Sequence, residues 1–191
     1  MKRLFAAIKI NPSAGFTATV NSLVSELRYE RIKWVETGNM HLTLKFFGET
    51  EEKRIPAINA ALKAAASKTP AFTLRIGRTG IFGSRYDPRV IWFGIDPEPT
   101  LQQLAADVFA ELEKAGWEPD RQNFVPHLTI GRIKELKDRL LFQDVIQKYR
   151  ETFIQEQPVY EVILYESILQ REGPQYIALQ KFPLLTPPAR S

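Results

Sequence analysis

The sequence contains no cysteine and only two histidines among its 191 residues. Without thiols the chain cannot form disulfides, thiolate metal sites or a cysteine nucleophile, so any catalysis must rely on other groups. Low-complexity stretches, long blocks of one charge and membrane-length apolar runs are also absent. The apolar run of the N-terminus stops at Lys9, which is too short for a secretory core. We therefore expect a cytoplasmic protein that does not associate with membranes.

The remaining composition is that of an ordinary globular protein, with 44% hydrophobic and 25% charged residues. A chain of 191 residues fits one compact, two-lobed domain over residues 1–191, and we expect a monomer. The formal net charge of +4 mildly favours polyanionic partners, although charge alone cannot identify them.

Hydrophobic periodicity predicts alternating segments of strand and helix. Strands are expected at residues 4–10, 41–47, 72–76, 90–95, 127–133, 159–169 and 176–182. Helices are expected near residues 16–27, 55–65, 101–112 and 141–149. An exposed basic loop containing Gly80 and Gly83 is expected before residue 90, a turn at 172–174, and a frayed tail at 187–188.

The order of these segments indicates a weak internal symmetry. Each half runs through a helix, a tryptophan (Trp34 or Trp117), a His-Leu-Thr strand and a second helix. The strands do not alternate regularly with crossover helices, which disfavours a parallel sheet. The sequence therefore predicts a bilobal, pseudo-symmetric α+β fold with mainly antiparallel sheets.

Both histidines open the same pattern, His-Leu-Thr followed by an aliphatic residue. Such a pattern follows a given histidine by chance about once in a thousand cases. Because side chains alternate along a strand, His41 shares a face with Thr43, and His127 shares a face with Thr129. Each motif thus presents an imidazole beside a hydroxyl group on a rigid element.

Paired imidazoles suit the cleavage of phosphodiesters. With an ordinary pKa of about 6.5, one imidazole can act as a base near neutral pH while the other, charged beside a bound phosphate, acts as an acid. The hydroxyls of Thr43 and Thr129 can donate hydrogen bonds to the non-bridging phosphate oxygens.

Two other interpretations compete with an acid–base pair. A lone histidine in a strand is more often an ordinary core residue, but the duplicated motif argues against that interpretation. A zinc site needs a third ligand, and neither motif is accompanied by a His-Glu-x-x-His pattern or a carboxylate cluster. We expect no metal and no cofactor.

With both motifs in view, the sequence resembles the two-histidine phosphoesterase superfamily, and within it the RNA 2′,3′-cyclic phosphodiesterases once named 2′-5′ RNA ligases. The resemblance rests on four blocks in order, RLFAAI (3–8), NMHLTLKFFGE (39–49), RVIWFG (89–94) and VPHLTIGR (125–132). It implies that both motifs lie on facing strands of a central groove, with helices on the outside.

The resemblance also implies an activity, namely hydrolysis of a 2′,3′-cyclic phosphate at an RNA end to a 2′-phosphomonoester. The partner would be an RNA or nucleotide carrying that cyclic phosphate. His41 would be the proton donor to the departing 3′-oxygen, and His127 the proton acceptor that activates water. The residues alone do not assign these two roles, because the motifs are nearly equivalent.

Arg132 follows the second motif, as an arginine often does in this family, and a guanidinium can bind phosphate through two parallel hydrogen bonds. On an ideal strand Arg132 points away from His127 and Thr129. A phosphate-binding role therefore requires a bend near Gly131.

Other residues near the motifs admit two interpretations. Phe46 and Phe47 are interpreted as core residues in preference to a stacking surface for a base. Arg85 and Arg89 either steer an RNA backbone toward the groove or are solvated loop charges.

Alternative functions remain open. The chain can also be interpreted as a non-catalytic nucleotide- or RNA-binding module that retains the groove, or as a ligase that reverses the same transesterification to give a 2′-5′ linkage. A Walker-type phosphate loop is absent, so ATP-dependent ligation has no support. The substrate is equally open between a tRNA fragment, an oligonucleotide, a mononucleotide and a cyclic ADP-ribose derivative.

Overall fold

The computed structural model describes residues 1–118, 123–171 and 173–186. Its strands are β1 (Lys2–Lys9), β2 (Arg31–Trp34), β3 (His41–Thr50), β4 (Phe72–Gly83), β5 (Pro88–Ile95), β6 (His127–Glu135), β7 (Phe153–Val159), β8 (Glu161–Leu169) and β9 (Pro174–Pro183). Its α-helices are α1 (Ala14–Glu26), α2 (Ile55–Ala66), α3 (Pro99–Lys114) and α4 (Arg139–Lys148). Short 3-10 turns lie at Thr37–Asn39 and Glu52–Arg54. Residue Glu172 of the predicted turn and the predicted frayed tail at Pro187-Pro188 lie outside the described residues.

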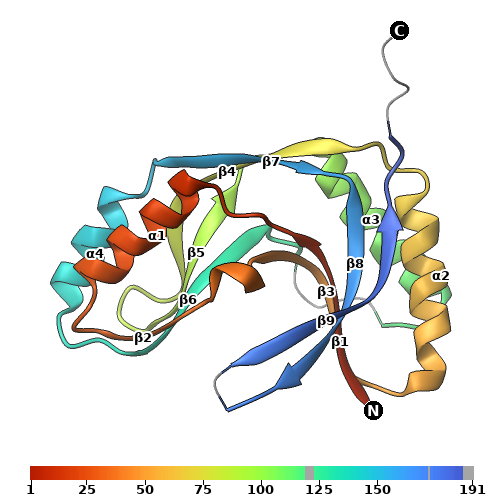
Figure 1. The fold of residues 1–191 in the computed structure, drawn as a ribbon, viewed down its shortest axis with the longest axis horizontal. Coiled ribbons are helices and arrows are strands. Elements are labelled where there is room, and N and C mark those ends of the chain that lie inside the picture. The colour runs from red at the N-terminus through yellow and green to blue at the C-terminus, as the bar shows by residue number, and fades with distance from the viewer. Residues whose placement is uncertain (119–122, 172, 187–191) are drawn as a thin grey trace, which may run out of the picture.

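The strands form two antiparallel sheets. We call the four-stranded sheet β3-β1-β8-β9 the His41 sheet and the five-stranded sheet β2-β6-β5-β4-β7 the His127 sheet. Figure 1 shows α2 and α3 together on the outer side of the His41 sheet, and α1 and α4 together beside the His127 sheet. The predicted α+β fold with antiparallel sheets and outer helices is confirmed.

The two lobes are not the two halves of the sequence. Helix α1 precedes β3 in the chain but packs on the other lobe, where Phe16 meets Phe93 of β5 at a ring distance of 5.3 Å. The two tryptophans also lie on the lobe of the other motif. Trp34 lies opposite Gly131 of β6, and Trp117 contacts Phe47 of β3 at 5.1 Å. Each lobe is therefore built from both halves of the chain.

One hydrophobic core underlies both motifs. Leu42 and Leu128, the residues directly after the two histidines, are fully buried and belong to the same core cluster. On α1, Phe16, Val20 and Leu23 supply the buried face, and the Ser13 side chain caps the helix by accepting the Phe16 N–H. The core thus fixes the strands from which the histidines project.

The structure corrects several sequence expectations. Strand β2 was missed because it is only four residues long. Strand β4 continues to Gly83, so Gly80 is a strand residue and not a loop residue; the Trp92 ring lies across it and leaves no room for a side chain. Strand β7 (Phe153–Val159) was also missed, and the expected strand at 159–169 is β8 (Glu161–Leu169), because the chain passes at Tyr160 from the His127 sheet to the His41 sheet. A corner of this kind leaves no mark in the alternation of apolar residues.

None of the helices in the described ranges is long and apolar enough to cross a membrane.

Candidate active site

Each histidine strand contains a β-bulge shortly after its motif. In β3, Ala7 of β1 pairs with Thr43 and Ala6 pairs with Lys45, which leaves Leu44 as an extra residue. Leu44 and Lys45 are consequently buried in succession, and Phe46 returns to the face of His41 and Thr43.

The second motif repeats this irregularity at the same offset. Ile91 of β5 pairs with Gly131 and Trp92 pairs with Thr129, which leaves Ile130 as the extra residue. Ile130 and Gly131 are both buried, and Arg132 is exposed. The bulge therefore turns Arg132 to the face of Thr129, and the chain has the bend that a phosphate-binding role for this arginine requires.

The two imidazoles are anchored in the same way. His41 Nδ1 lies 2.7 Å from the Asn39 carbonyl oxygen, and His127 Nδ1 lies 2.8 Å from the Val125 carbonyl oxygen. A carbonyl oxygen only accepts, so each Nδ1 must carry the proton and donate. This arrangement fixes the tautomer and leaves Nε2 of each ring available for proton transfer.

Aromatic rings hold both imidazoles in position. His41 packs against Phe5 at 4.9 Å and meets Tyr176 of β9 at 5.1 Å with an interplanar angle of 85°. His127 meets Phe82 at 4.6 Å and 90°. The rings restrict rotation of both histidines without competing for their Nε2 atoms.

The pKa of His41 depends on charged groups of the other sheet. Its pKa is lowered chiefly because burial disfavours the charged ring, while the hydrogen bond to Asn39 opposes that shift. The positive charge of Arg132 and the electrostatic interaction with His127, both on the other sheet, lower this pKa further. The three groups therefore lie within electrostatic reach of one another, as an acid–base pair with a phosphate-binding cation requires.

Sequence reasoning missed Tyr176 and misjudged Phe46. Burial raises the pKa of the Tyr176 hydroxyl, and the nearby charge of Arg132 counteracts this, so Tyr176 also faces the site. Phe46 was expected in the core, but 59% of it is exposed on the His41 face, because the bulge at Leu44 reverses its direction. Phe47 is packed against the core as expected. Only the register of β3 against β1 reveals the difference between the two phenylalanines.

Arg85 lies in the β4–β5 connection and Arg89 near the start of β5, and each contacts a neighbour in this region. The guanidinium of Arg89 donates to the Asp87 carboxylate at 3.0 and 3.1 Å. The guanidinium of Arg85 lies 4.9 Å from the centre of the Tyr86 ring. Among the residues that the structure describes, no cluster of three or more histidines and carboxylates could hold a metal ion.

These features define a class of site: two neighbouring strands, each carrying an anchored imidazole beside a threonine, with an arginine of the second strand within electrostatic reach of the first imidazole. Such a site can exchange protons on opposite sides of a bound phosphate group.

Comparison with known proteins agrees with this class. The family model of the 2′-5′ RNA ligase superfamily matches residues 16–168, and the chain belongs to this superfamily. The RNA 2′,3′-cyclic phosphodiesterase of Archaeoglobus fulgidus is 33% identical over 181 residues, covering 94% of this chain and 99% of that protein. That of Aquifex aeolicus is 34% identical over 152 residues, covering 78% and 80% of the two chains. The family resemblance inferred from the motifs is confirmed.

Solved structures agree as well. The protein TT0787 of Thermus thermophilus matches with a TM-score of 0.76 and 30% identity, covering 95% of this chain and 97% of that one. Escherichia coli LigT, solved in complex with 3′-AMP, matches with a TM-score of 0.73 and 26% identity, covering 96% and 98%.

Proposed function

We propose that this chain is an RNA 2′,3′-cyclic phosphodiesterase that hydrolyses the terminal cyclic phosphate to a 2′-phosphomonoester without a metal ion. The observation that carries the proposal is the pair of histidines, His41 and His127, each anchored through Nδ1, with His41 within electrostatic reach of both His127 and Arg132. The names of the relatives support the substrate class.

The proposed reaction uses the two Nε2 atoms. His127 accepts a proton from water, whose oxygen attacks the phosphorus atom. The bond from phosphorus to the 3′-oxygen breaks, and His41 donates a proton to that oxygen, so the phosphate remains on the 2′-oxygen. Thr43, Thr129 and Arg132 hold the non-bridging oxygens, where negative charge accumulates in the transition state.

The lowered pKa of His41 has a consequence for this cycle. In the free protein the ring is biased toward its neutral form, which cannot donate a proton from Nε2. A bound phosphate brings negative charge beside the ring and raises its pKa. His41 is therefore charged by a proton taken up when substrate binds, and it enters the reaction as the acid.

The reverse transesterification is a second candidate, because the superfamily takes its name from 2′-5′ RNA ligation. A 5′-hydroxyl in place of water would form the 2′-5′ linkage without ATP. We further propose that residues 1–191 act as one monomeric domain in the cytoplasm. The shared hydrophobic core of the two sheets supports a single domain, and the net charge of +4 suits a polyanionic substrate.

The test is hydrolysis of an RNA with a 2′,3′-cyclic phosphate end in excess chelator, with the product resolved as 2′- or 3′-monophosphate. We expect only the 2′-product, and a loss of turnover of roughly a hundred- to ten-thousand-fold in His41→Ala and in His127→Ala. Lys63→Ala, on the exposed side of α2, is the control and should retain full activity.

Each result has a separate meaning. A 3′-monophosphate would mean that the 2′-oxygen, and not the 3′-oxygen, is the leaving group. Near wild-type turnover in either histidine variant would exclude the acid–base pair. Loss of turnover in chelator would exclude the metal-free reaction. Nucleotide binding by the wild type without any turnover would favour the non-catalytic binding module instead.

A further inference from the structure

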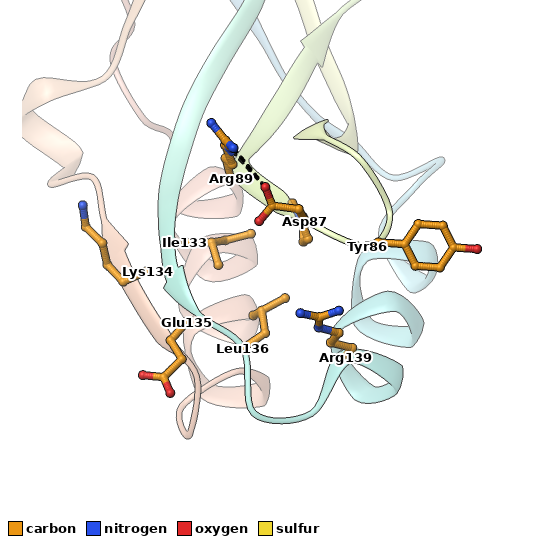
Figure 2. Close-up of a pocket in the computed structure, with 9 residues that line it drawn as sticks. Tyr86, Asp87, Arg89, Ile133, Lys134, Glu135, Leu136 and Arg139 are labelled. Carbon is orange, nitrogen blue, oxygen red and sulfur yellow. Dashed lines mark hydrogen bonds and ion pairs between the residues drawn. The ribbon is translucent and has the colours of Figure 1, made fainter.

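A concave site lies at the far end of β6 from His127. It is a cleft of about 420 Å³, within the size range of small-ligand sites. Figure 2 shows it between the β4–β5 connection, the end of β6 and the start of α4. The residues that the argument uses are Tyr86, Pro88, Arg89, Ile133, Leu136 and Arg139. Pro88, Ile133 and Leu136 are buried or half-buried and supply its apolar part.

The cleft carries an excess of positive charge. Its two carboxylates are already paired, Asp87 with Arg89 at 3.0 Å and Glu135 with Arg31 at 2.8 Å. Arg139 has no carboxylate within 4 Å among the described residues, and Figure 2 shows its guanidinium directed toward the space beside Leu136. An anionic ligand would therefore meet an uncompensated cation here.

The β4–β5 connection presents an exposed aromatic ring at the rim. Tyr86 is 66% exposed, and Figure 2 shows its ring pointing outward from the rim. The Arg85 guanidinium lies 4.9 Å from the ring centre, and the exposed remainder of the ring is accessible for stacking. The connection is fixed on both sides. The Asp87 N–H donates to Ser84 Oγ at 2.9 Å, and the Gln143 side-chain amide of α4 donates to the Arg85 carbonyl at 3.3 Å. The backbone that carries Tyr86 is thus held in place before any ligand arrives, which lowers the entropic cost of ordering this connection on binding.

Cations connect this cleft to the face of β6 that carries His127. Arg132 lies on that face, and Lys33 of β2 lies directly opposite it in the register. Lys134 follows two residues later and is exposed. From His127 to Lys134 the strand covers roughly 20 Å. A stacked strand of nucleic acid rises about 3.4 Å per nucleotide, so the cleft would be reached about six nucleotides from the reacting phosphate.

From these observations we infer that the cleft binds the RNA chain on the 5′ side of the cyclic phosphate. A nucleobase stacks on Tyr86, and backbone phosphates contact Arg139 and Lys134. The inference rests on the proposed function and names its substrate class, an oligonucleotide in place of a mononucleotide. The apolar part of the cleft, the exposed ring and the uncompensated cation together match a nucleotide unit with its base and phosphate.

The test compares an RNA of about ten nucleotides, carrying a 2′,3′-cyclic phosphate, with a nucleoside 2′,3′-cyclic monophosphate. In Lys134→Glu/Arg139→Glu we expect KM for the oligonucleotide to rise at least tenfold, with kcat and the mononucleotide reaction unchanged. The dependence of log KM on log salt should weaken by about 1.4 for two lost phosphate contacts. Tyr86→Leu should raise KM for the oligonucleotide only, without altering the salt dependence.

The substitutions at the cleft are expected to leave the fold intact, so a change in KM can be assigned to binding. Arg139 occupies the first turn of α4, where the helix dipole favours a negative charge over a positive one, so glutamate is not expected to destabilise the helix. Lys63→Glu on α2 makes one charge reversal of the same kind far along the chain from the cleft residues, and this control should leave the reaction of both substrates unaffected. Thermal unfolding of every variant verifies the fold.

Fluorescence anisotropy with the same oligonucleotide separates this inference from the proposed function. If the wild type binds the oligonucleotide and the double variant binds it at least tenfold more weakly, the cleft is supported even where turnover fails. If the double variant and Tyr86→Leu bind and hydrolyse the oligonucleotide like the wild type, the cleft is not an RNA site. Equal losses on both substrates in a folded variant would also overturn the inference, because they would place these residues in catalysis.

Discussion

Replacement of Gly80 by alanine is expected to disturb His127 through the aromatic rings packed between the two residues. A Cβ built on Gly80 would lie 2.1 Å from Cζ2 and 2.3 Å from Cη2 of the Trp92 indole. Carbon atoms in contact prefer about 3.5–4.0 Å, so the indole must move by more than about 1 Å. Trp92 contacts Phe82 at 5.6 Å, and Phe82 meets His127 at 4.6 Å. The displacement would therefore reach the imidazole through two rings.

The magnitude follows from packing and positioning. Overpacking of a core costs about 1–3 kcal/mol of stability, which an ordinary domain tolerates. A displacement of about 1 Å in a reacting group costs up to about a hundredfold in rate. We expect Gly80→Ala to fold, with kcat on cyclic-phosphate RNA lowered ten- to a hundredfold. Steady-state kinetics, thermal unfolding and tryptophan fluorescence measure these effects.

A matched control and a rescue make the argument refutable. Gly15→Ala is the same substitution near the start of α1, where the nearest atoms to the new Cβ lie at an ordinary 3.8 Å, and it should retain full activity. Trp92→Phe removes the colliding part of the indole, so adding Gly80→Ala to it should cost nothing further. Wild-type kcat in Gly80→Ala, or additive losses in the double variant, would refute the proposed route to His127.

Three further predictions concern charge and stacking. The proposed acid, protonated His41, is lost as pH rises through its pKa, and this loss produces the alkaline limb of kcat/KM. Because the charge of Arg132 lowers the pKa of His41, Arg132→Gln should raise that pKa and move the alkaline limb to higher pH in a pH–rate profile. The Tyr149 hydroxyl donates to Glu26 at 2.6 Å and lowers its pKa, so this contact stabilises the fold fully above the unfolded pKa of about 4.3, and the contribution is lost as pH falls through the lowered pKa of the folded state. Tyr149→Phe should therefore lose up to about 1 kcal/mol at pH 7 in denaturant titrations, and less as pH falls below that pKa. Phe46→Leu should raise KM for a cyclic-phosphate nucleotide five- to thirtyfold without loss of thermal stability, because the ring is 59% exposed.

The sequence predicted the chemistry of the site better than its geometry. The two motifs could be found because a short strand enforces alternation, which places His41 with Thr43 whatever lies around them. Arg132 and Phe46 lie just beyond the motifs, and their directions depend on bulges. A bulge is set by pairing with a neighbouring strand, here β5 or β1, and the sequence of one strand does not contain that information.

The same limit applies to the fold. The repeated order of helix, tryptophan and motif was correctly predicted, but it suggested that each half of the chain forms one lobe. In space the helix before each motif packs on the other lobe, because the chain crosses between the sheets before His41 and again before His127. Tyr176 was missed for the same reason. It reaches His41 from β9, more than a hundred residues along the chain, through pairing that only the assembled His41 sheet reveals.

The two motifs have the same backbone pairing pattern, and they differ in the side chain that the bulge turns to the face of the histidine. Five positions after each histidine, the His41 strand presents Phe46 and the His127 strand presents Arg132. One histidine strand thus offers an exposed aromatic ring and the other a cation. A nucleotide end has the matching polarity, with a flat base on one side and a charged phosphate on the other. Two equivalent imidazoles cannot by themselves decide which one meets the 3′-oxygen, so on the proposed mechanism it is the unequal pair Phe46 and Arg132 that orients the phosphate and thereby assigns acid and base.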